Sequence, residues 1–211
     1  MITEKNSLSG SVAILYTDFV CPWCYIIEKE LEPFITREQL NIEYVYYPLH
    51  PDTPDEGMTL NELFSGRNVD VEKAQQAIRL KAQTMGLKWT TRNHTYNSRN
   101  AQLLAKYLEG SEYHNAFRGQ VFDAYFGRGK NISDLGLLSD IFLTLNIPGR
   151  NVSELLIDPD LNAILDADWN HCRSVGITGV PTLCYEDRYC VGAQNSDILR
   201  SFLTPVDSKE P

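Results

Sequence analysis

Residues 12–24 of the 211-residue chain read Val-Ala-Ile-Leu-Tyr-Thr-Asp-Phe-Val-Cys-Pro-Trp-Cys, a strand pattern followed by the start of a helix. The apolar run from Val12 to Tyr16 predicts a short strand. A helical pattern follows from about Pro22, and proline suits the first helical turn because its missing N–H would have no partner there. We therefore expect Cys21 at the N-terminus of a helix, with Cys24 in the first turn.

Two cysteines at this spacing can close a small disulfide ring if the helix starts between them. Unpaired N–H groups and the helix dipole favour a thiolate at Cys21. Such a thiolate attacks a disulfide or an oxidised sulfur, and a second cysteine resolves the mixed disulfide. The pattern predicts a redox-active pair in which Cys21 is the exposed nucleophile and Cys24 is the buried resolving residue.

Structural zinc and two reduced core thiols are the alternatives for this pair. Zinc requires four ligands, usually from a second Cys-x-x-Cys or a Cys/His pair. Cys184 and Cys190 are spaced too loosely for such a site, and the histidines at 50, 94, 114 and 171 are scattered along the chain. The sequence favours the redox interpretation, with no metal and no resident cofactor expected.

The remaining elements predict one α/β domain interrupted by helices. Residues 42–47 predict a second strand, and residues 182–185 and 189–191 predict a hairpin around a polar three-residue turn. Neither end of the chain holds enough strands for a sheet of its own, so both must contribute to one sheet. We expect residues 1–57 and 151–211 to form the sheet domain and residues 58–150 to form an all-helical insertion.

Capping residues, prolines and glycines delimit the predicted helices. Pro33 is expected to kink or end the first helix. Thr59 and Glu62 form a capping box, and Asp70 can cap a helix that ends at Gly86. Further helices are predicted around residues 101–108 and 111–126, from Ser133 to Pro148, around residues 161–172, and from Ser196 to about Leu203.

Val180-Pro181 stands immediately before the predicted strand of residues 182–185. An X-Pro bond at a strand start can be cis. A cis proline beside two cysteines would leave the N–H and C=O of Val180 free to pair with an extended substrate. A plain strand-entry proline is the alternative, and the dipeptide by itself would favour it.

Together these signals resemble the thioredoxin superfamily, and within it the DsbA-like branch with a helical insertion. The resemblance covers nearly the whole chain and is greatest to the FrnE-like subgroup of cytoplasmic DsbA-family oxidoreductases. It implies an α/β thioredoxin fold, Cys21 as nucleophile, Cys24 as resolving cysteine and Pro181 in cis. The segments that carry it are Asp18–Tyr25, Asn97-Ser98 with Ala101, Ala124-Tyr-Phe with Asn131-Ile-Ser-Asp134, Gly176–Thr182 and Gly192-Ala-Gln194.

The same branch contains glutathione-dependent relatives, the kappa-class glutathione transferases and the 2-hydroxychromene-2-carboxylate isomerases. They typically carry serine at the nucleophile position, because they activate the thiol of glutathione instead of their own. This chain has Cys21 there and also Cys24, and it has Ala193-Gln194 where the kappa transferases place a Ser-Asp pair. The resemblance thus implies thiol–disulfide exchange on protein or peptide thiols, with glutathione or another thiol as redox partner. A glutathione-dependent isomerase or transferase acting on a small aromatic molecule is the alternative, and a non-catalytic binding protein is a third.

Four more residues are candidates for the same site. Pro22 and Trp23 lie between the cysteines, and Trp23 is either an exposed contact for a substrate or a cap on the apolar rim of the insertion. Asp18 and Glu28 are candidates to take a proton from Cys24, although an ordinary structural or solvated carboxylate is the more frequent explanation.

Cys184 and Cys190 flank the hairpin turn. With a three-residue turn they would lie opposite each other on one face, about 4.5–5.5 Å apart at Cα, which is within disulfide reach. They are therefore a candidate second redox pair, and two small apolar strand residues are the alternative. Cys172 lies on an apolar helical stripe, which is typical of a core thiol.

The chain carries 19 Lys and Arg against 28 Asp and Glu, a formal net charge of −9. A strongly acidic protein is poorly suited to neutralise phosphates, so we expect no nucleic-acid partner and no anionic membrane surface. No apolar run approaches the ~20 residues that span a bilayer. The polar start of the sequence lacks the apolar run of a secretory signal, so we expect a cytoplasmic protein.

Overall fold

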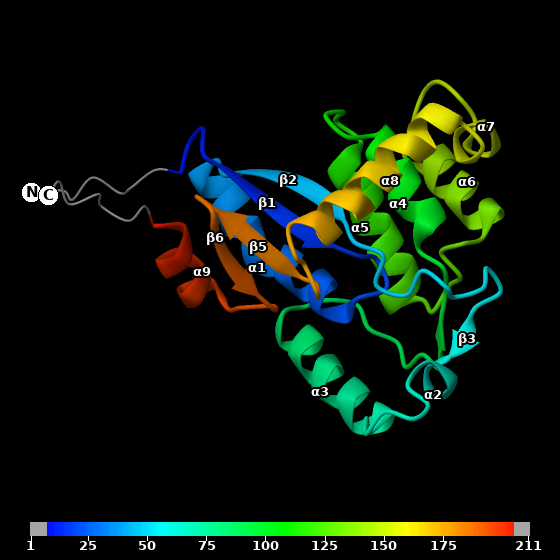
Figure 1. Cartoon of the computed structure of the whole chain (residues 1–211), viewed down its shortest axis with the longest axis horizontal. Helices are drawn as coiled ribbons and strands as arrows, with labels where there is room; N and C mark the ends of the chain where they lie inside the picture. Colours follow the sequence, from blue (N-terminus) through cyan, green and yellow to red (C-terminus); the bar gives the residue numbers. More distant parts are fainter. Residues whose placement is uncertain (1–7, 205–211) are drawn as a thin grey trace, which may run out of the picture.

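Residues 8–204 are described by the computed structural model, and a four-stranded mixed sheet lies among them in the order β2-β1-β5-β6 (Figure 1). β1 and β2 are parallel, β5 pairs antiparallel with β1, and β6 pairs antiparallel with β5. The strands are β1 Val12–Thr17, β2 Asn41–Tyr46, β5 Thr182–Tyr185 and β6 Arg188–Val191. The prediction that both ends of the chain contribute to one sheet is confirmed.

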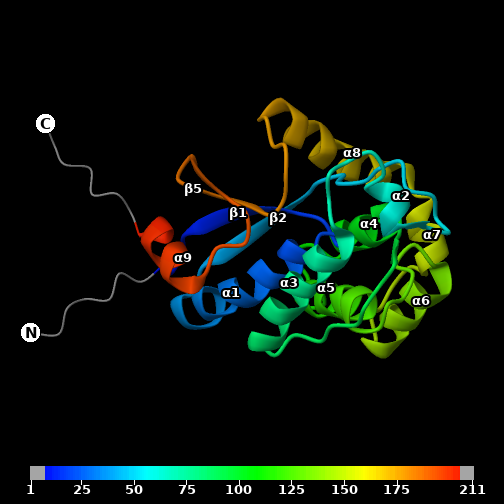
Figure 2. The ribbon, with the colours of Figure 1, turned by 90° about the horizontal axis from the view of Figure 1, so that it is seen from below.

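Helices lie on both sides of this sheet and gather beyond the carboxyl ends of β1 and β2 (Figures 1 and 2). Figure 2 shows α1 on one side of β1 and β2, and α8 on the other. The helices are α1 Pro22–Glu38, α2 Leu60–Leu63, α3 Val71–Thr84, α4 Arg99–Tyr107, α5 His114–Phe122, α6 Leu135–Thr144, α7 Val152–Leu156, α8 Pro159–Ser174 and α9 Ser196–Leu203, with a π-helical turn at Asp123–Gly127.

Two of the predicted helix starts form as the sequence indicates. The Oγ1 of Thr59 accepts the N–H of Glu62, and the Glu62 carboxylate accepts the N–H of Thr59, which completes the capping box of α2. Asp70 accepts the N–H of Lys73 at the start of α3. In both cases a side chain satisfies N–H groups that the first turn leaves unpaired.

Two other predicted caps are wrong by one residue. Asp134 caps α6 in place of Ser133, and Asn195 caps α9 in place of Ser196. Both serines donate their hydroxyls to carboxylates of other elements. The side-chain oxygens of the neighbouring Asp and Asn therefore take the capping bonds.

The first helix and the insertion also differ from expectation. α1 continues through Pro33 to Glu38, because its buried apolar face extends past the proline, and it ends at Gln39 in a left-handed conformation. Two short strands, β3 Met58–Thr59 and β4 His94–Thr95, pair within the predicted insertion. The insertion is therefore not all-helical.

The hairpin of β5 and β6 corrects the prediction for its two cysteines. Its turn has two residues, 186–187, both with positive φ, instead of three. Cys184 therefore lies opposite Tyr189, and Cys190 lies opposite Leu183. A shift of one residue places the two thiols on opposite faces of the sheet, so they do not form a disulfide-ready pair.

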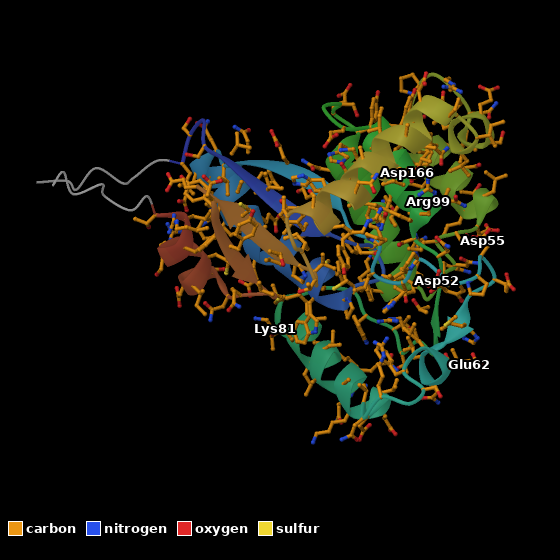
Figure 3. All side chains as sticks on the ribbon, viewed as in Figure 1. Asp52, Asp55, Glu62, Lys81, Arg99 and Asp166 are labelled. Atoms are coloured by element: carbon orange, nitrogen blue, oxygen red, sulfur yellow. The ribbon has the colours of Figure 1, made fainter. Side chains whose placement is uncertain are left out.

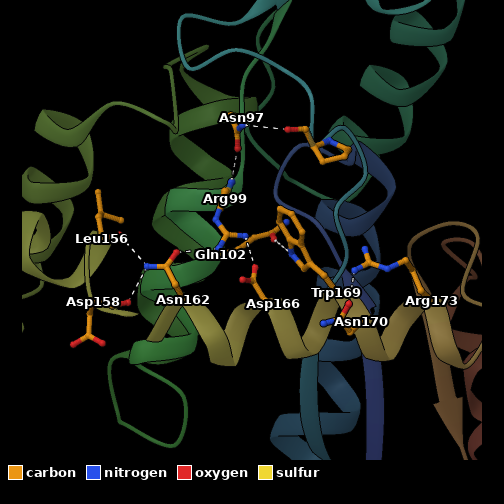
Figure 4. A network of polar contacts seen from close by, with 11 residues as sticks. Asn97, Arg99, Gln102, Leu156, Asp158, Asn162, Asp166, Trp169, Asn170 and Arg173 are labelled. Atoms are coloured by element: carbon orange, nitrogen blue, oxygen red, sulfur yellow. Dashed lines mark hydrogen bonds and ion pairs between the residues drawn. The ribbon is translucent and has the colours of Figure 1, made fainter. Parts of the chain in front are cut away.

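A polar network joins α4 to α8 (Figure 4). Arg99 forms an ion pair with Asp166 at 2.8 Å and donates to Asn162 at 2.9 Å. The indole N–H of Trp169 donates to Gln102 at 2.9 Å, and the Arg99 guanidinium lies 4.8 Å from a ring centroid of Trp169. These contacts fix the helical region against the helix that leads back to the sheet.

The larger of two hydrophobic clusters among the described residues runs from one face of the sheet into the helices, and the smaller one includes Tyr16 and Cys172. The larger cluster includes Leu15 and Leu183 from the sheet and Phe117 and Leu138 from the helices. The division into residues 1–57 with 151–211 and residues 58–150 stays a prediction, and residues 1–7 and 205–211 lie outside the described residues. Within residues 8–204, no helix is both long and apolar enough to span a bilayer.

Candidate active site

The two cysteines of the motif lie at the start of α1. Cys21 is the N-cap residue with extended backbone angles (φ −85°, ψ 114°), and Pro22 follows at the first helical position. The N–H of Cys24 donates to the carbonyl of Cys21 at 3.1 Å. The predicted order of strand, cysteine and helix is confirmed, and both thiols are free.

Cys21 is less exposed than the sequence predicts. Only 3% of its surface is exposed, against 0% for Cys24. Its thiol donates to the carbonyl of Val180 at 3.3 Å. The prediction of an exposed nucleophile is therefore wrong for this state, because the loop before β5 lies directly against the sulfur.

Strand pairing places that loop. Thr182, the first residue of β5, pairs with Tyr16 near the end of β1, and Cys21 follows five residues later. The Val180-Pro181 bond is cis, as expected. The sheet therefore brings together two segments that are about 160 residues apart in the sequence.

Cys24 lies inside the protein. Burial raises the pKa of its thiol well above the ordinary value, and a hydrogen bond with Cys21 adds to the increase. A backbone hydrogen bond from Asp18 acts in the opposite direction. Cys24 is therefore held protonated, whereas Cys21 lies at the N–H end of the helix.

Trp23 and Pro22 occupy the turn between the cysteines. Trp23 is 40% exposed and Pro22 is half-buried. The indole is thus open to a partner that approaches the site, and its role as a substrate contact stays a prediction.

Asp18 is fully buried before the cysteine turn. Its Oδ1 accepts the N–H of Val20 at 3.0 Å, and its Oδ2 accepts the N–H of Leu49 at 2.9 Å. Burial raises the pKa of the carboxyl to about 6, although these bonds and those with Ser98 and Gln102 oppose the increase. Both oxygens bind backbone, so the contacts support the structural interpretation of Asp18.

Two asparagines fix the loop of residues 48–57, which follows β2. Asn97 donates to the carbonyl of Thr53, and Asn131 donates to the carbonyl of Asp55, each at 2.8 Å. Asp55 lies on this loop, away from the sheet (Figure 3). Both asparagines belong to the segments that carry the family resemblance, and their contacts give them a structural role.

Glu28 is engaged in an ion pair instead of being aimed at Cys24. It pairs with Arg118 of α5, whose guanidinium also donates to Tyr46 at 2.7 Å and lies 3.5 Å from the ring centroid of Tyr44. Burial alone would lower the pKa of Arg118, but Glu28 and the tyrosines raise it. The structural interpretation holds for this carboxylate too.

The sequence interpretation missed an aromatic stack that starts at Tyr25, directly after Cys24, and an arginine that packs against this stack. Tyr25 stacks on Phe126 at 5.3 Å, and Phe126 stacks on Trp89 at 5.2 Å, between ring centroids. Arg92 lies against this stack, with the central carbon of its guanidinium 4.9 Å from the ring centroid of Phe126 and 5.9 Å from that of Trp89. The sequence gives the spacing of Trp89 and Arg92, but nothing in it places that segment near Cys21.

A cavity of about 700 Å³ lies under α3, outside the cysteine site. Asn61, Gln75 and Trp89 are among its lining residues. Trp89 thus lines the cavity and also belongs to the aromatic stack. The cavity therefore borders one end of the aromatic stack, whose other end is Tyr25.

Cys172 is the core thiol that the sequence predicts. It is buried on α8, and its Sγ donates to the carbonyl of Tyr46 at 3.6 Å. Among the residues that the structure describes, no group of three or more His, Cys, Asp and Glu side chains is placed to hold a metal ion.

The chain matches the family model described as DSBA-like thioredoxin domain over residues 12–204. YwbO, an uncharacterised protein of Bacillus subtilis strain 168, is 22% identical over 206 residues, which cover 93% of this chain and 97% of YwbO.

Several solved structures share this fold. A probable DsbA oxidoreductase from Streptomyces coelicolor has a TM-score of 0.81 and 21% identity, covering 92% of this chain and 88% of that one. A 2-hydroxychromene-2-carboxylate isomerase has a TM-score of 0.73 and 18% sequence identity, and the match covers 91% of this chain and 94% of the isomerase. The cytosolic disulfide reductase DsbM from Pseudomonas aeruginosa, solved with glutathione, has a TM-score of 0.60 and 20% sequence identity. The match covers 91% of this chain and 96% of DsbM. The family model spans nearly all the described residues, so this chain belongs to the DSBA-like thioredoxin domain family.

Proposed function

We propose that this chain is a thiol–disulfide oxidoreductase of the FrnE-like subgroup that acts on protein or peptide thiols and disulfides. The observation that carries the proposal is the arrangement of two free thiols within one helical turn. Cys21 occupies the N-cap position of α1, with its thiol bonded to the Val180 carbonyl, and Cys24 is fully buried in the first turn. Two thiols in different surroundings, one against the Val180 carbonyl and one with a pKa raised by burial, suit the two successive steps of disulfide exchange.

In the reducing direction, the cysteine pair transfers two electrons to a substrate disulfide in two steps. The Cys21 thiolate attacks one sulfur of a substrate disulfide, forms a mixed disulfide and releases the other substrate sulfur as a thiolate. Cys24 then loses its proton and attacks Cys21, which forms the Cys21–Cys24 disulfide and releases the second substrate thiol. The substrate gains two electrons, and the cysteine pair loses two. The oxidising direction is the reverse.

Val180, Pro181 and Trp23 are the residues proposed to position the substrate. The Val180 carbonyl accepts the Cys21 thiol in the reduced protein. Loss of that proton frees the carbonyl to accept an N–H from an extended substrate segment. The indole of Trp23 is open to the same segment.

We propose glutathione or another small thiol as the redox partner and assign no resident cofactor. The neighbouring structure of DsbM with glutathione supports this partner, and its description as cytosolic supports a cytoplasmic location.

A trapping experiment tests this proposal. The Cys24→Ser variant, mixed with a dithionitrobenzoate-activated peptide thiol, should accumulate a mixed disulfide at Cys21, because the resolving thiol is absent. Cys21→Ser should trap nothing, and Cys190→Ser should turn over like the unmodified protein. Equal turnover in Cys21→Ser and the unmodified protein would contradict the proposal.

A glutathione-dependent isomerase or transferase is the second candidate. The fold likeness to 2-hydroxychromene-2-carboxylate isomerase, with a TM-score of 0.73, supports it. One variant distinguishes the two candidate functions. Cys21→Ser should abolish disulfide exchange but should spare an activity that uses the thiol of glutathione.

A further inference from the structure

The cavity of about 700 Å³ under α3 lies between three segments of the chain (Figure 1). Its walls are the start of α2, the part of α3 up to Arg79, and residues 89–93. Its volume is in the range of ligand pockets, about 300–1,000 Å³. Asn61, Gln76 and Asn93, one residue from each wall, are exposed, so the cavity opens to solvent.

Contacts with neighbouring elements hold the walls of this cavity in place. The N–H of Leu60 at the start of α2 donates to the carbonyl of Asn93 at 2.8 Å, which joins two of the walls. Lys81, near the end of α3, forms an ion pair with Glu30 of α1 at 2.9 Å. The walls are therefore fixed by the fold itself, as in most ligand sites.

Four side-chain amides line the cavity, those of Asn61, Gln75, Gln76 and Asn93. Each supplies an acceptor oxygen and two N–H donors. Among residues 8–204, the side chains of Asn61, Gln76 and Asn93 form no hydrogen bond. The Oε1 of Gln75 is buried without a donor among those residues, which is unfavourable for an acceptor. The cavity therefore offers donors and acceptors in pairs, as a peptide group does.

The other lining residues disfavour two further classes of ligand. Among the described residues that line the cavity, Arg79 alone is basic, and Glu72 of the same helix is acidic. A phosphate or another polyanion is therefore poorly matched to the cavity. A small aromatic molecule needs a predominantly apolar lining, whereas this cavity supplies only Leu60, Val71 and Trp89. A polypeptide backbone fits the paired donors and acceptors best.

Trp89 connects this cavity to the cysteine turn. Its ring stacks on Phe126 at 5.2 Å, and Phe126 stacks on Tyr25 at 5.3 Å, between ring centroids. The N–H of Tyr25 donates to the carbonyl of Cys21 at 3.3 Å. An extended chain advances about 3.3–3.6 Å per residue, so a segment of about six residues is long enough to reach from Cys21 to the cavity.

We propose that this cavity binds an extended polypeptide segment of the substrate, next to the substrate cysteine that reacts with Cys21. The four amides pair with N–H and C=O groups of the bound backbone, and the ring of Trp89 packs against it. Contacts of this kind recognise the backbone instead of particular side chains. They therefore favour extended polypeptides over small thiols such as glutathione. The inference rests on the proposed function and adds the class of its substrate.

Peptide binding is measured first without disulfide chemistry. The probe is a fluorescein-labelled peptide of about twelve Ser, Thr and Gly residues, which is long enough to extend about six residues to either side of its centre. The double variant Gln76→Ala, Asn93→Ala removes one amide from each of two walls. Its Kd from fluorescence anisotropy should be about tenfold higher than that of the unmodified protein, because two hydrogen bonds are lost. Gln83→Ala is the matched control and should leave the Kd unchanged, since Gln83 is an exposed amide of α3 outside the cavity.

The rate of reaction at Cys21 is the second measurement. In the Cys24→Ser background, release of thionitrobenzoate is followed for two activated disulfides, the same peptide with a central cysteine and N-acetylcysteine amide. The Gln76→Ala, Asn93→Ala pair should lower the second-order rate constant for the peptide about tenfold, because that constant includes the binding of the peptide. The rate constant for N-acetylcysteine amide should not change, because this molecule is too short to reach the cavity.

Equal Kd values for the unmodified protein and the double variant, with both folded by circular dichroism, would overturn the inference. Absence of saturable peptide binding to the unmodified protein, or an equal loss of rate for both activated disulfides, would also overturn it. If the double variant does not fold, the two single variants replace it, each with an expected rise in Kd of about threefold. If the peptide binds but Cys21 reacts with neither disulfide, the proposed function fails, while the anisotropy still decides whether the cavity binds a polypeptide.

Discussion

The carboxylate of Asp18 is placed inside the protein by two backbone N–H groups, those of Val20 and Leu49. These bonds hold the start of the 48–57 loop against the segment that carries Cys21. Burial nevertheless raises the pKa of Asp18 to about 6. One side chain thus orders the surroundings of the site and makes the fold sensitive to pH.

The folded-state pKa of Asp18 lies above its unfolded value, so ionisation is less favourable in the folded protein. Stability is highest below the unfolded pKa and decreases as pH rises through about 6. Asp18→Asn removes this dependence. Relative to the variant, the native protein should lose about 1 kcal/mol of unfolding free energy between pH 5.0 and 7.5, measured by urea unfolding. A difference that stays constant across this range would contradict the prediction.

The β5–β6 hairpin shows how one residue of turn length changes the chemistry of an element. Its two-residue turn places Cys184 and Cys190 on opposite faces. In a Cys21→Ser, Cys24→Ser variant, diamide should therefore produce no disulfide between Cys184 and Cys190, as checked by peptide mapping. The unmodified protein, which should form the Cys21–Cys24 disulfide, is the control for the oxidant. Recovery of a Cys184–Cys190 peptide would show that the register is wrong.

The 48–57 loop depends on side chains from distant elements. Asn97→Ala and Asn131→Ala should each weaken this loop by about 1 kcal/mol, because each loses a hydrogen bond to a loop carbonyl. Amide hydrogen exchange in the loop should accelerate several-fold. Asn170→Ala is the control, since Asn170 is exposed and bonds to Arg173 within α8 (Figure 4). Equal protection in all three variants would show that the loop is held by other contacts.

Across the whole molecule, the Glu28–Arg118 pair connects α1 of the sheet region to α5 of the helical region. Arg118→Met leaves the Glu28 carboxylate without its counter-ion, and loss of one partner of a buried pair costs about 3–5 kcal/mol. Urea unfolding should show this loss. The double variant Glu28→Gln, Arg118→Met should recover part of it, because neither charge then remains unpaired. Strictly additive losses would mean that the two side chains contribute independently.

Local signals in the sequence were sufficient for most of the elements, but not for the short strands β3 and β4. The run from Val12 to Tyr16, Pro22 and the capping box at Thr59 each gave a correct strand or helix start. Where neighbours competed, as at Ser133 and Asp134, the choice depended on a distant carboxylate. Pro33 was overridden because packing of the buried face of α1 outweighs the lost hydrogen bond.

By itself, the sequence determined the strand–Cys21–helix arrangement, the position of Cys24 and the contribution of both chain ends to one sheet, because these follow from local periodicity and strand count. Only the tertiary structure decided that Val180 lies against Cys21, that Cys184 and Cys190 face apart, and that Tyr25 stacks on Phe126. Each of these depends on strand register or on contacts between segments far apart in the chain. The burial of these side chains and the distances between them result from tertiary packing, which a local sequence pattern does not contain.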